Sequence, residues 1–164
     1  MSGHRASVEM DFQPNWTYLP AVRSFVKEFI TISHADKKKA EAIALAVNEM
    51  IENAIKYSDR EGVRIRLDLS AALSVTVAVH NHAAATEIRN LQSLLAEINK
   101  QPPLEAYLDR MQATGESRDS KSSLGLARIR YETGAKVSAR YDEQDGEVTV
   151  LAEFEPPAPA EEGS

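Results

Sequence analysis

Apolar residues recur along the chain with two different periods, and blocks of the two periods alternate. Alternation with period two over residues 6–12 predicts a strand at the edge of a sheet. Helical spacing follows over about 15–31, where Asn15 is placed to cap the first turn. A second and longer helix is predicted over about 35–57.

The second half of the chain repeats this change of period. The remaining predicted elements are strands at 62–69 and 73–80, amphipathic helical segments at 86–99 and 103–113, a small and polar segment at 114–123, a loop entering a helix at 124–131, and strands at 135–142 and 147–155. Gly134 is placed to end the last helix, and Asp145-Gly146 is typical of a tight turn between the last two strands.

This order of elements favours an α+β fold rather than a parallel α/β sheet. Strands that follow one another directly pair antiparallel, and the apolar stripes of the helices need a sheet face to cover. We therefore expect a two-layer sandwich, with an antiparallel or mixed sheet and the helices on one face. Residues 1–155 are expected to form one domain, followed by a disordered tail at 156–164 that is rich in Pro, Ala and Glu.

Composition excludes several classes of function. The 164 residues carry a net charge of −6, and Lys37-Lys38-Lys39 is the one basic cluster, which argues against nucleic-acid binding. The chain has no cysteine, which excludes disulfides and thiolate metal sites. No apolar run approaches the ~18 residues of a membrane span, and the N-terminus lacks a signal pattern. We expect a soluble cytoplasmic protein.

The second helix carries the most informative motif, the stretch 48–58. Glu49, Asn53 and Lys56 lie at i, i+4 and i+7, so they share one side of the helix, beside its apolar stripe. A carboxylate and an amide at the edge of the core suit a proton acceptor and a divalent cation. The alternative is an ordinary helix surface on which Glu52 pairs with Lys56.

The stretch 49–58, followed by two strands, resembles the N-box of the Bergerat-type ATPase domain. Histidine kinases, gyrase-like ATPases and bacterial anti-sigma-factor serine kinases share this domain. The resemblance covers about residues 8–155 and, because of the small size, is closest to the anti-sigma-factor kinase branch. It implies that Glu49 is the general base, that Asn53 ligates Mg²⁺ and that Lys56 lies near the phosphates of ATP.

The resemblance also implies a turn that binds adenine after the third strand, normally Asp-x-Gly-x-Gly. Here the aligned stretch is 80–85, with Asn81 in place of the Asp and with Ala83 and Ala85 in place of glycines. An asparagine oxygen can still accept a hydrogen bond from the adenine amine, but its amide adds two donors. Alanine disfavours the backbone conformations that glycine permits.

A third element of the family is a glycine-rich turn that wraps the phosphates before a helix. The stretch 122–127 resembles it, with Ser123 in place of the first glycine. Leu124, Gly125 and Leu126 would then offer backbone amides to a phosphate. The alternative is a plain turn before an apolar helix. The resemblance also implies that residues 86–123 correspond to the family's lid over the nucleotide.

Three further residues are weaker candidates. His80 and His82 share one face at a strand end and could hold zinc, although two histidines without a neighbouring carboxylate are more typical of polar loop residues. Arg128 could reach a phosphate, although a solvated position on its helix is the simpler interpretation.

The leading functional hypothesis is a bacterial partner-switching regulator. It would be an ATP- and Mg²⁺-dependent protein serine/threonine kinase of the anti-sigma-factor type, with an antagonist-like protein or a sigma factor as its partner and with homodimers allowed by the resemblance. The alternative is a non-catalytic binding module with a degenerate nucleotide site. A clamp driven by ATP hydrolysis is disfavoured, because the chain leaves no room for a transducer domain.

Overall fold

The computed structural model describes residues 4–13, 15–33, 37–60, 62–114 and 121–156. The elements in chain order are β1 (His4–Phe12), the short 3-10 helix η1 (Trp16–Tyr18), α1 (Leu19–Ser33), α2 (Lys37–Tyr57), β2 (Val63–Ser70), β3 (Val75–His82), α3 (Ala85–Lys100), α4 (Pro103–Thr114), α5 (Lys121–Thr133), β4 (Lys136–Asp142) and β5 (Glu147–Phe154). The tail predicted at 156–164 lies outside the described residues apart from Pro156, as do residues 115–120 of the predicted polar segment.

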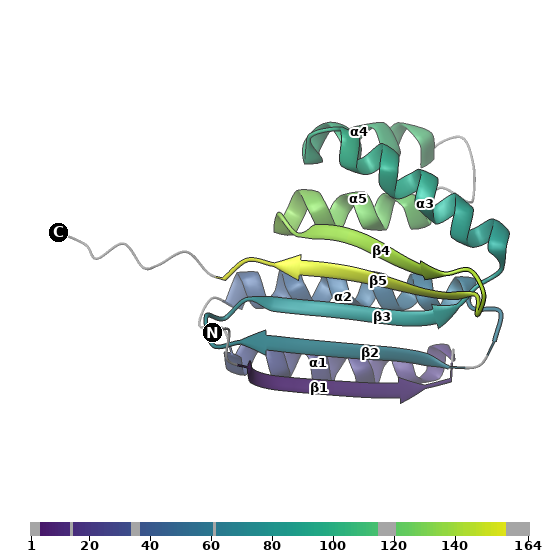
Figure 1. The fold of residues 1–164 in the computed structure, drawn as a ribbon. Helices are drawn as coiled ribbons and strands as arrows, with labels where there is room; N and C mark the ends of the chain where they lie inside the picture. The colour runs from purple at the N-terminus through teal and green to yellow at the C-terminus, as the bar shows by residue number, and fades with distance from the viewer. Residues whose placement is uncertain (1–3, 14, 34–36, 61, 115–120, 157–164) are drawn as a thin grey trace.

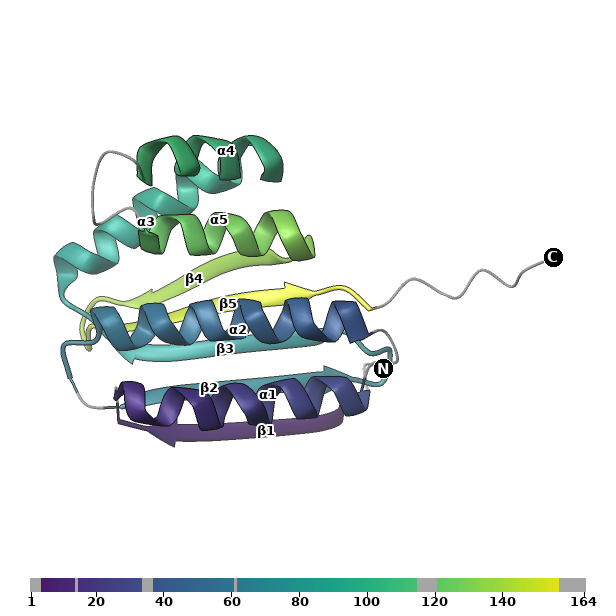
Figure 2. The same cartoon turned by 180° about the vertical axis from the view of Figure 1, so that it is seen from behind.

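The five strands form one sheet in the order β1-β2-β3-β5-β4, and every neighbouring pair is antiparallel. The helices cover one face of this sheet (Figures 1 and 2), with α1 over β1 and β2 and with α2 over β3. The α+β two-layer fold expected from the sequence is therefore confirmed.

Period-two alternation sorts the residues of each strand between the two layers. In β2, Ile65 and Leu67 are fully buried beneath the helices, whereas Arg64 and Arg66 are exposed on the opposite face. In the helix layer, α2 contributes the largest share of the core, because its apolar stripe lies directly on the sheet. Its buried apolar residues are Ala40, Ile43, Ala44, Ala46, Val47, Met50, Ile51, Ala54 and Ile55.

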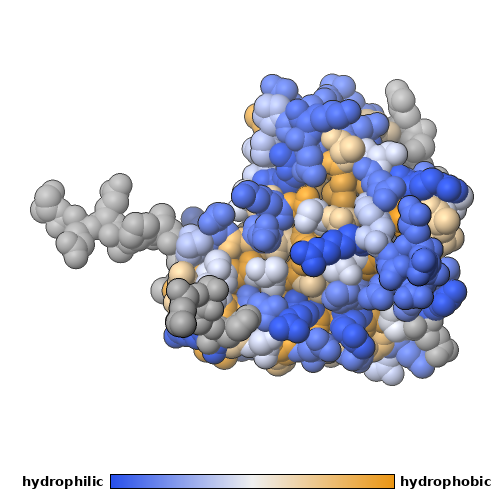
Figure 3. Space-filling model, in the orientation of Figure 1, coloured by the Kyte–Doolittle hydropathy of each residue, from blue (hydrophilic) through white to orange (hydrophobic). Residues whose placement is uncertain are grey.

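The opposite face of the sheet carries charged pairs, one between β1 and β2 and one within β2. Arg64 Nε lies 2.8 Å from Asp11 Oδ1, and Arg66 Nε lies 2.9 Å from Asp68 Oδ2. In the space-filling view of this face, polar and charged residues surround short apolar strips (Figure 3). The polar alternation of the strands is thus explained by solvent on this side.

Two predicted boundaries were wrong by a few residues, and both affect the site. The β2–β3 hairpin has a longer loop than predicted, in which Leu73 adopts a positive φ of 67° and its N–H donates to the Ser70 carbonyl. As a result β3 runs from Val75 to His82, and Asn81 lies within the strand rather than after it. Helix α5 begins at Lys121, earlier than the predicted entry at 124.

Helices α3 and α4 form a hairpin that packs on α5. The guanidinium group of Arg130, on α5, donates hydrogen bonds to the carbonyl oxygens of Ile98 and Gln101 at the C-terminal end of α3. The last carbonyl groups of a helix have no hydrogen-bond partner within the helix. A cation fixed at this end donates to them and interacts favourably with the negative end of the helix dipole. Arg130 therefore joins the insert to the rest of the fold.

In the part of the chain that the structure describes, no helix combines the length and the apolar character that crossing a bilayer requires.

We expect Arg130→Ala to lower the free energy of unfolding by roughly 1.5–3 kcal/mol, because charged and partly buried hydrogen bonds to two carbonyl groups are lost. Arg89→Ala, which removes an exposed arginine of α3, should change it by at most about 0.5 kcal/mol. Urea denaturation followed by circular dichroism measures both, and equal effects of the two substitutions would contradict the role given to Arg130.

Candidate functional site

The carboxylate of Glu49 lies where α2 packs against α5. The two helices run antiparallel and side by side (Figure 2), and Gly125 of α5 faces Glu49. A Cβ atom placed on Gly125 would lie only 2.6 Å from Glu49 Oε2. The missing side chain at position 125 thus leaves the room that the carboxylate occupies. Two motifs that are far apart in the sequence, one on each helix, meet at this contact.

Further charged residues surround this contact. Gly125, Arg128 and Glu132 recur at i, i+3 and i+7, so they share the side of α5 that faces α2. Arg128 Nε lies 2.9 Å from Glu132 Oε1, and Asn48 Nδ2 donates to Glu52 Oε1 over 2.9 Å on α2. The site therefore holds several carboxylates and one guanidinium group.

The pKa of Glu49 is raised from its ordinary value, chiefly because burial disfavours the charged carboxylate. The negative charge of Glu52 raises it further, the positive charge of Arg128 opposes the shift, and Glu132 adds a smaller increase. A carboxylate with a raised pKa is a better proton acceptor at neutral pH than an exposed one.

The other two polar residues of the α2 motif lie on the same side of the helix as Glu49, as predicted. The side chain of Asn53 is partly buried, and Lys56 is exposed, with its Nζ 5.2 Å from the ring centroid of Tyr57. The amide of Asn53 could thus provide an oxygen ligand beside a solvent-accessible ammonium group.

Asn81 lies on the helix side of β3 and is only 5% exposed. Its Nδ2 donates to the carbonyl of His82 over 3.2 Å, and the same carbonyl accepts from the backbone N–H of Asp59. In this orientation one N–H of the Asn81 amide has a partner. The acceptor atom Oδ1 points away from the His82 carbonyl. The hydrogen bond from Asp59 to the His82 carbonyl places the end of β3 beside the C-terminal end of α2, where Asn53 and Lys56 lie.

The two alanines that replace family glycines take ordinary backbone conformations. Among the described residues, Leu73 is the one non-glycine with positive φ, so neither Ala83 nor Ala85 needs glycine's freedom. Ala83 is buried, and its N–H donates to the carbonyl of Gly146 in the β4–β5 turn over 3.0 Å. Ala85 is the first residue of α3.

The glycine-rich turn predicted at 122–127 is helical instead. Because α5 begins at Lys121, Ser123 and Leu124 lie in its first turn, and Gly125 and Leu126 lie beyond it. The backbone N–H groups without a helical partner belong to the first turn. Gly125 therefore accommodates Glu49 in this structure, and Leu126 is buried in the core. The side chain of Ser123 is outside the described residues.

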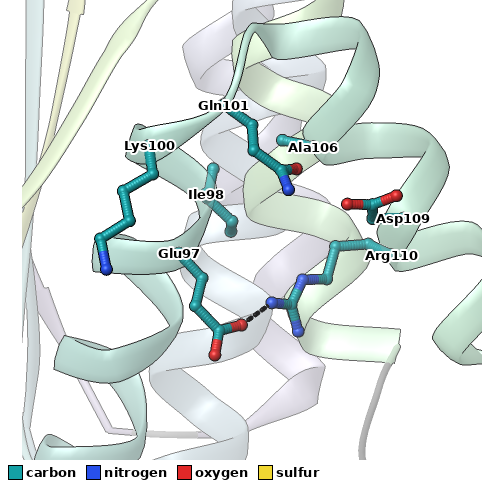
Figure 4. A pocket seen from close by; sticks show the side chains of 7 residues that line it. All are labelled: Glu97, Ile98, Lys100, Gln101, Ala106, Asp109 and Arg110. Atoms are coloured by element: carbon teal, nitrogen blue, oxygen red, sulfur yellow. Dashed lines mark hydrogen bonds and ion pairs between the residues drawn. The ribbon is translucent and has the colours of Figure 1, made fainter.

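A separate pocket of about 200 Å³ lies in the α3–α4 hairpin (Figure 4). It is lined by Glu97, Ile98, Lys100, Gln101, Ala106, Asp109 and Arg110. Arg110 points toward Glu97 and forms an ion pair with it. The pocket contains none of the site residues predicted from the sequence.

Among the described residues, no group of three or more His, Asp or Glu side chains is placed to hold a metal ion. His80 lies 2.6 Å from Thr149 Oγ1 and 3.5 Å from Glu147 Oε1, measured from its Nδ1. A magnesium ion needs no such cage, since one or two protein oxygens together with phosphates usually hold it. The single amide of Asn53 fits that mode of binding.

The sequence model of the histidine kinase-like ATPase domain matches residues 12–130, which is most of the chain. The chain belongs to the histidine kinase-like ATPase family. The Bergerat-type resemblance recognised in the motifs at 49–58, 80–85 and 122–127 is confirmed by this match.

Among solved structures, this family member is similar to a chain in the crystal structure of the SiaB–SiaC complex from Pseudomonas aeruginosa. The TM-score is 0.69 at 13% sequence identity, and the match covers 90% of this chain and 88% of the other. At this identity the likeness establishes the shared fold. No curated protein matches the sequence.

Sequence reasoning placed Glu49, Asn53 and Lys56 on one side of α2, but it named Arg128 of α5 only as a weaker candidate and did not name Glu132. In the structure the side chain of Arg128 is 41% exposed, in keeping with the solvated position that the sequence favours, and it pairs with Glu132 and lowers the pKa of Glu49. The spacing of Gly125, Arg128 and Glu132 carried the signal. This spacing indicates a shared side of the helix only when α5 is known to begin at Lys121 and to pack on α2.

Glu49→Gln should stabilise the protein at neutral pH. Because the folded-state pKa of Glu49 lies above the unfolded one, its charged form destabilises the fold above that pKa, and the penalty disappears as pH falls below the ordinary value. We expect a rise in Tm of about 2 °C at pH 7.5, shrinking toward zero near pH 4.

Thermal melts of the wild type and the variant at both pH values measure this difference. Glu105→Gln, which changes an exposed glutamate of α4, should leave Tm nearly unchanged. A rise in Tm that is the same at both pH values, or a loss of stability at pH 7.5, would refute the claim that the buried charge of Glu49 destabilises the fold.

Proposed function

We propose that the protein is a partner-switching regulator of the anti-sigma-factor kinase type, which transfers phosphate from ATP to a serine or threonine of a small antagonist-like protein. The observation that carries the proposal is the contact of Glu49 with Gly125. It brings the N-box carboxylate, with its raised pKa, to the helix that follows the lid.

In the proposed reaction Glu49 accepts the proton of the partner's hydroxyl group. The hydroxyl oxygen attacks the γ-phosphorus as the bond to the bridging oxygen breaks, and ADP leaves. Magnesium, when bound, neutralises charge on the phosphates. The protein's part is to orient the hydroxyl and to hold the proton on the Glu49 carboxylate.

The remaining residues supply binding. Asn53 would hold Mg²⁺ through its amide oxygen, and Lys56 would lie near the phosphates. Asn81 would accept from the adenine amine through Oδ1, because its Nδ2 already donates to the His82 carbonyl. Ser123, Leu124, Gly125 and Leu126 would border the phosphates.

The family match supports nucleotide binding, and the likeness to a chain of the SiaB–SiaC complex supports a protein partner. A small antagonist-like protein is therefore the preferred partner, ahead of a sigma factor. A homodimer and a cytoplasmic location complete the proposal.

A second candidate is a binding module with the same fold and little catalysis. It is favoured by Ala83 and Ala85 in place of glycines and by the helical conformation of residues 121–126. Under this hypothesis α5 stays in contact with Glu49, and the protein binds its partner without a nucleotide.

Titration with ATP and Mg²⁺, followed by thermal unfolding, separates the two candidates. A kinase should gain about 2.7 kcal/mol of stability when ATP is present at 100 times its dissociation constant. Asn53→Ala should remove the part of this gain that depends on Mg²⁺. An unchanged Tm at millimolar ATP would leave the binding module as the function.

If ATP binds, Glu49→Ala should abolish transfer of labelled phosphate to the antagonist-like protein and keep most of the ATP-dependent stabilisation. The reason is that the general base acts on the attacking hydroxyl rather than on the bound nucleotide. Loss of ATP binding with transfer retained is the result incompatible with this role.

A further inference from the structure

Helix α4 presents large apolar side chains to solvent. Leu104, Leu108 and Met111 are 47%, 48% and 48% exposed, and they recur at i, i+4 and i+7. Such residues share one face of a helix. We call these three residues the α4 ridge. The helix packs on the fold through other positions, chiefly the buried Ala106 and the partly buried Tyr107.

The α4 ridge is connected to the candidate site through α5. Tyr107 stacks on Tyr131 of α5, with ring centroids 5.2 Å apart and an interplanar angle of 9°. Tyr131 is itself 46% exposed. Helix α5 lies between α4 and α2 in both ribbon views (Figures 1 and 2). The ridge, the tyrosine pair and Glu49 thus follow one another across three neighbouring helices.

The distance across these helices matches the reach of one protein interface. Packed helices lie 8–10 Å apart, so the α4 ridge and Glu49 are separated by roughly 20 Å. An interface of standard size covers about 800 Å² on each partner, which is a patch roughly 30 Å wide. A single bound protein is therefore large enough to span the separation between the ridge and Glu49.

The charges around the α4 ridge indicate which class of partner can bind there. Arg128 and Arg110 already pair with Glu132 and Glu97. On α4 and on the side of α2 that faces α5, the described carboxylates outnumber the described cations, which are Arg110 and Lys56. These carboxylates are Glu105, Asp109, Glu49 and Glu52. A second copy of the chain would bring acid against acid, and an anionic membrane would be repelled.

We propose that the α4 ridge, with Tyr131, is the docking surface for the phosphoacceptor protein, and that this protein presents an apolar patch bordered by lysine and arginine. This inference rests on the proposed function for the identity of the occupant. The surface itself follows from the exposed ridge, the tyrosine stack and the excess of carboxylates. Apolar contact supplies the affinity, and the basic border sets the orientation.

Two labelled helical peptides test the surface without any nucleotide. Both carry the same leucine stripe, flanked by lysines in one and by glutamates in the other, and fluorescence anisotropy reports their binding to the 164-residue chain. We expect the lysine peptide to bind at least tenfold more tightly at low salt. Leu104→Ser/Leu108→Ser should weaken it at least tenfold.

Ile32→Ser is the matched control, because Ile32 is an 81% exposed apolar residue on α1. It should leave peptide binding unchanged. Equal binding of the two peptides, or an equal loss in the control, would overturn the proposal. So would sedimentation that shows a dimer in the wild type and a monomer in the double variant, since the occupant would then be a second copy.

With an antagonist-like protein that is phosphorylated in a Glu49-dependent reaction, the double variant should raise KM at least tenfold and leave kcat and ATP binding unchanged. An unchanged KM would contradict the docking role. Failure of ATP binding in the wild type would instead contradict the proposed kinase and leave the peptide result to decide the surface.

Discussion

The close packing of α5 on α2 through Gly125 is the constraint on which the site depends. At position 125 helix α5 has no side chain, and its backbone lies against the Glu49 carboxylate. No residue type other than glycine would leave room for that carboxylate. Burial against α5 raises the pKa of Glu49, and the same packing brings Arg128 and Glu132 alongside. A tight contact between backbone and carboxylate thus creates the chemistry that the α2 motif alone only suggests.

The fold maintains this contact from both sides. The apolar stripe of α2 is anchored on the sheet by fully buried residues such as Val47 and Ile51, so Glu49 is held on the side away from the strands. Helix α5 is fixed by its own buried residues and by Arg130, which joins it to α3. The half-buried Glu49 carboxylate therefore lies between two helices that are each anchored in the fold by buried residues.

The sequence predicted the layers well, because the period of the apolar residues determines which face of each element is buried. It also predicted the shared side of Glu49, Asn53 and Lys56, since local spacing alone decides it. The helical start of α5 could not be predicted, because Ser122, Ser123 and Gly125 are typical of a turn when read locally. Their helical state depends on packing against α2 and α4, as does the position of Arg128.

The account is tested most directly by the titration of the Glu49 side chain, followed by carbon NMR of the assigned carboxyl group. The midpoint should lie above the ordinary glutamate value of about 4.3. In Gly125→Ala the new Cβ displaces the carboxylate toward solvent, so the midpoint should move back toward that value while the fold is retained. An ordinary midpoint in the wild type, or one unaffected by the alanine, would contradict the central role of this contact.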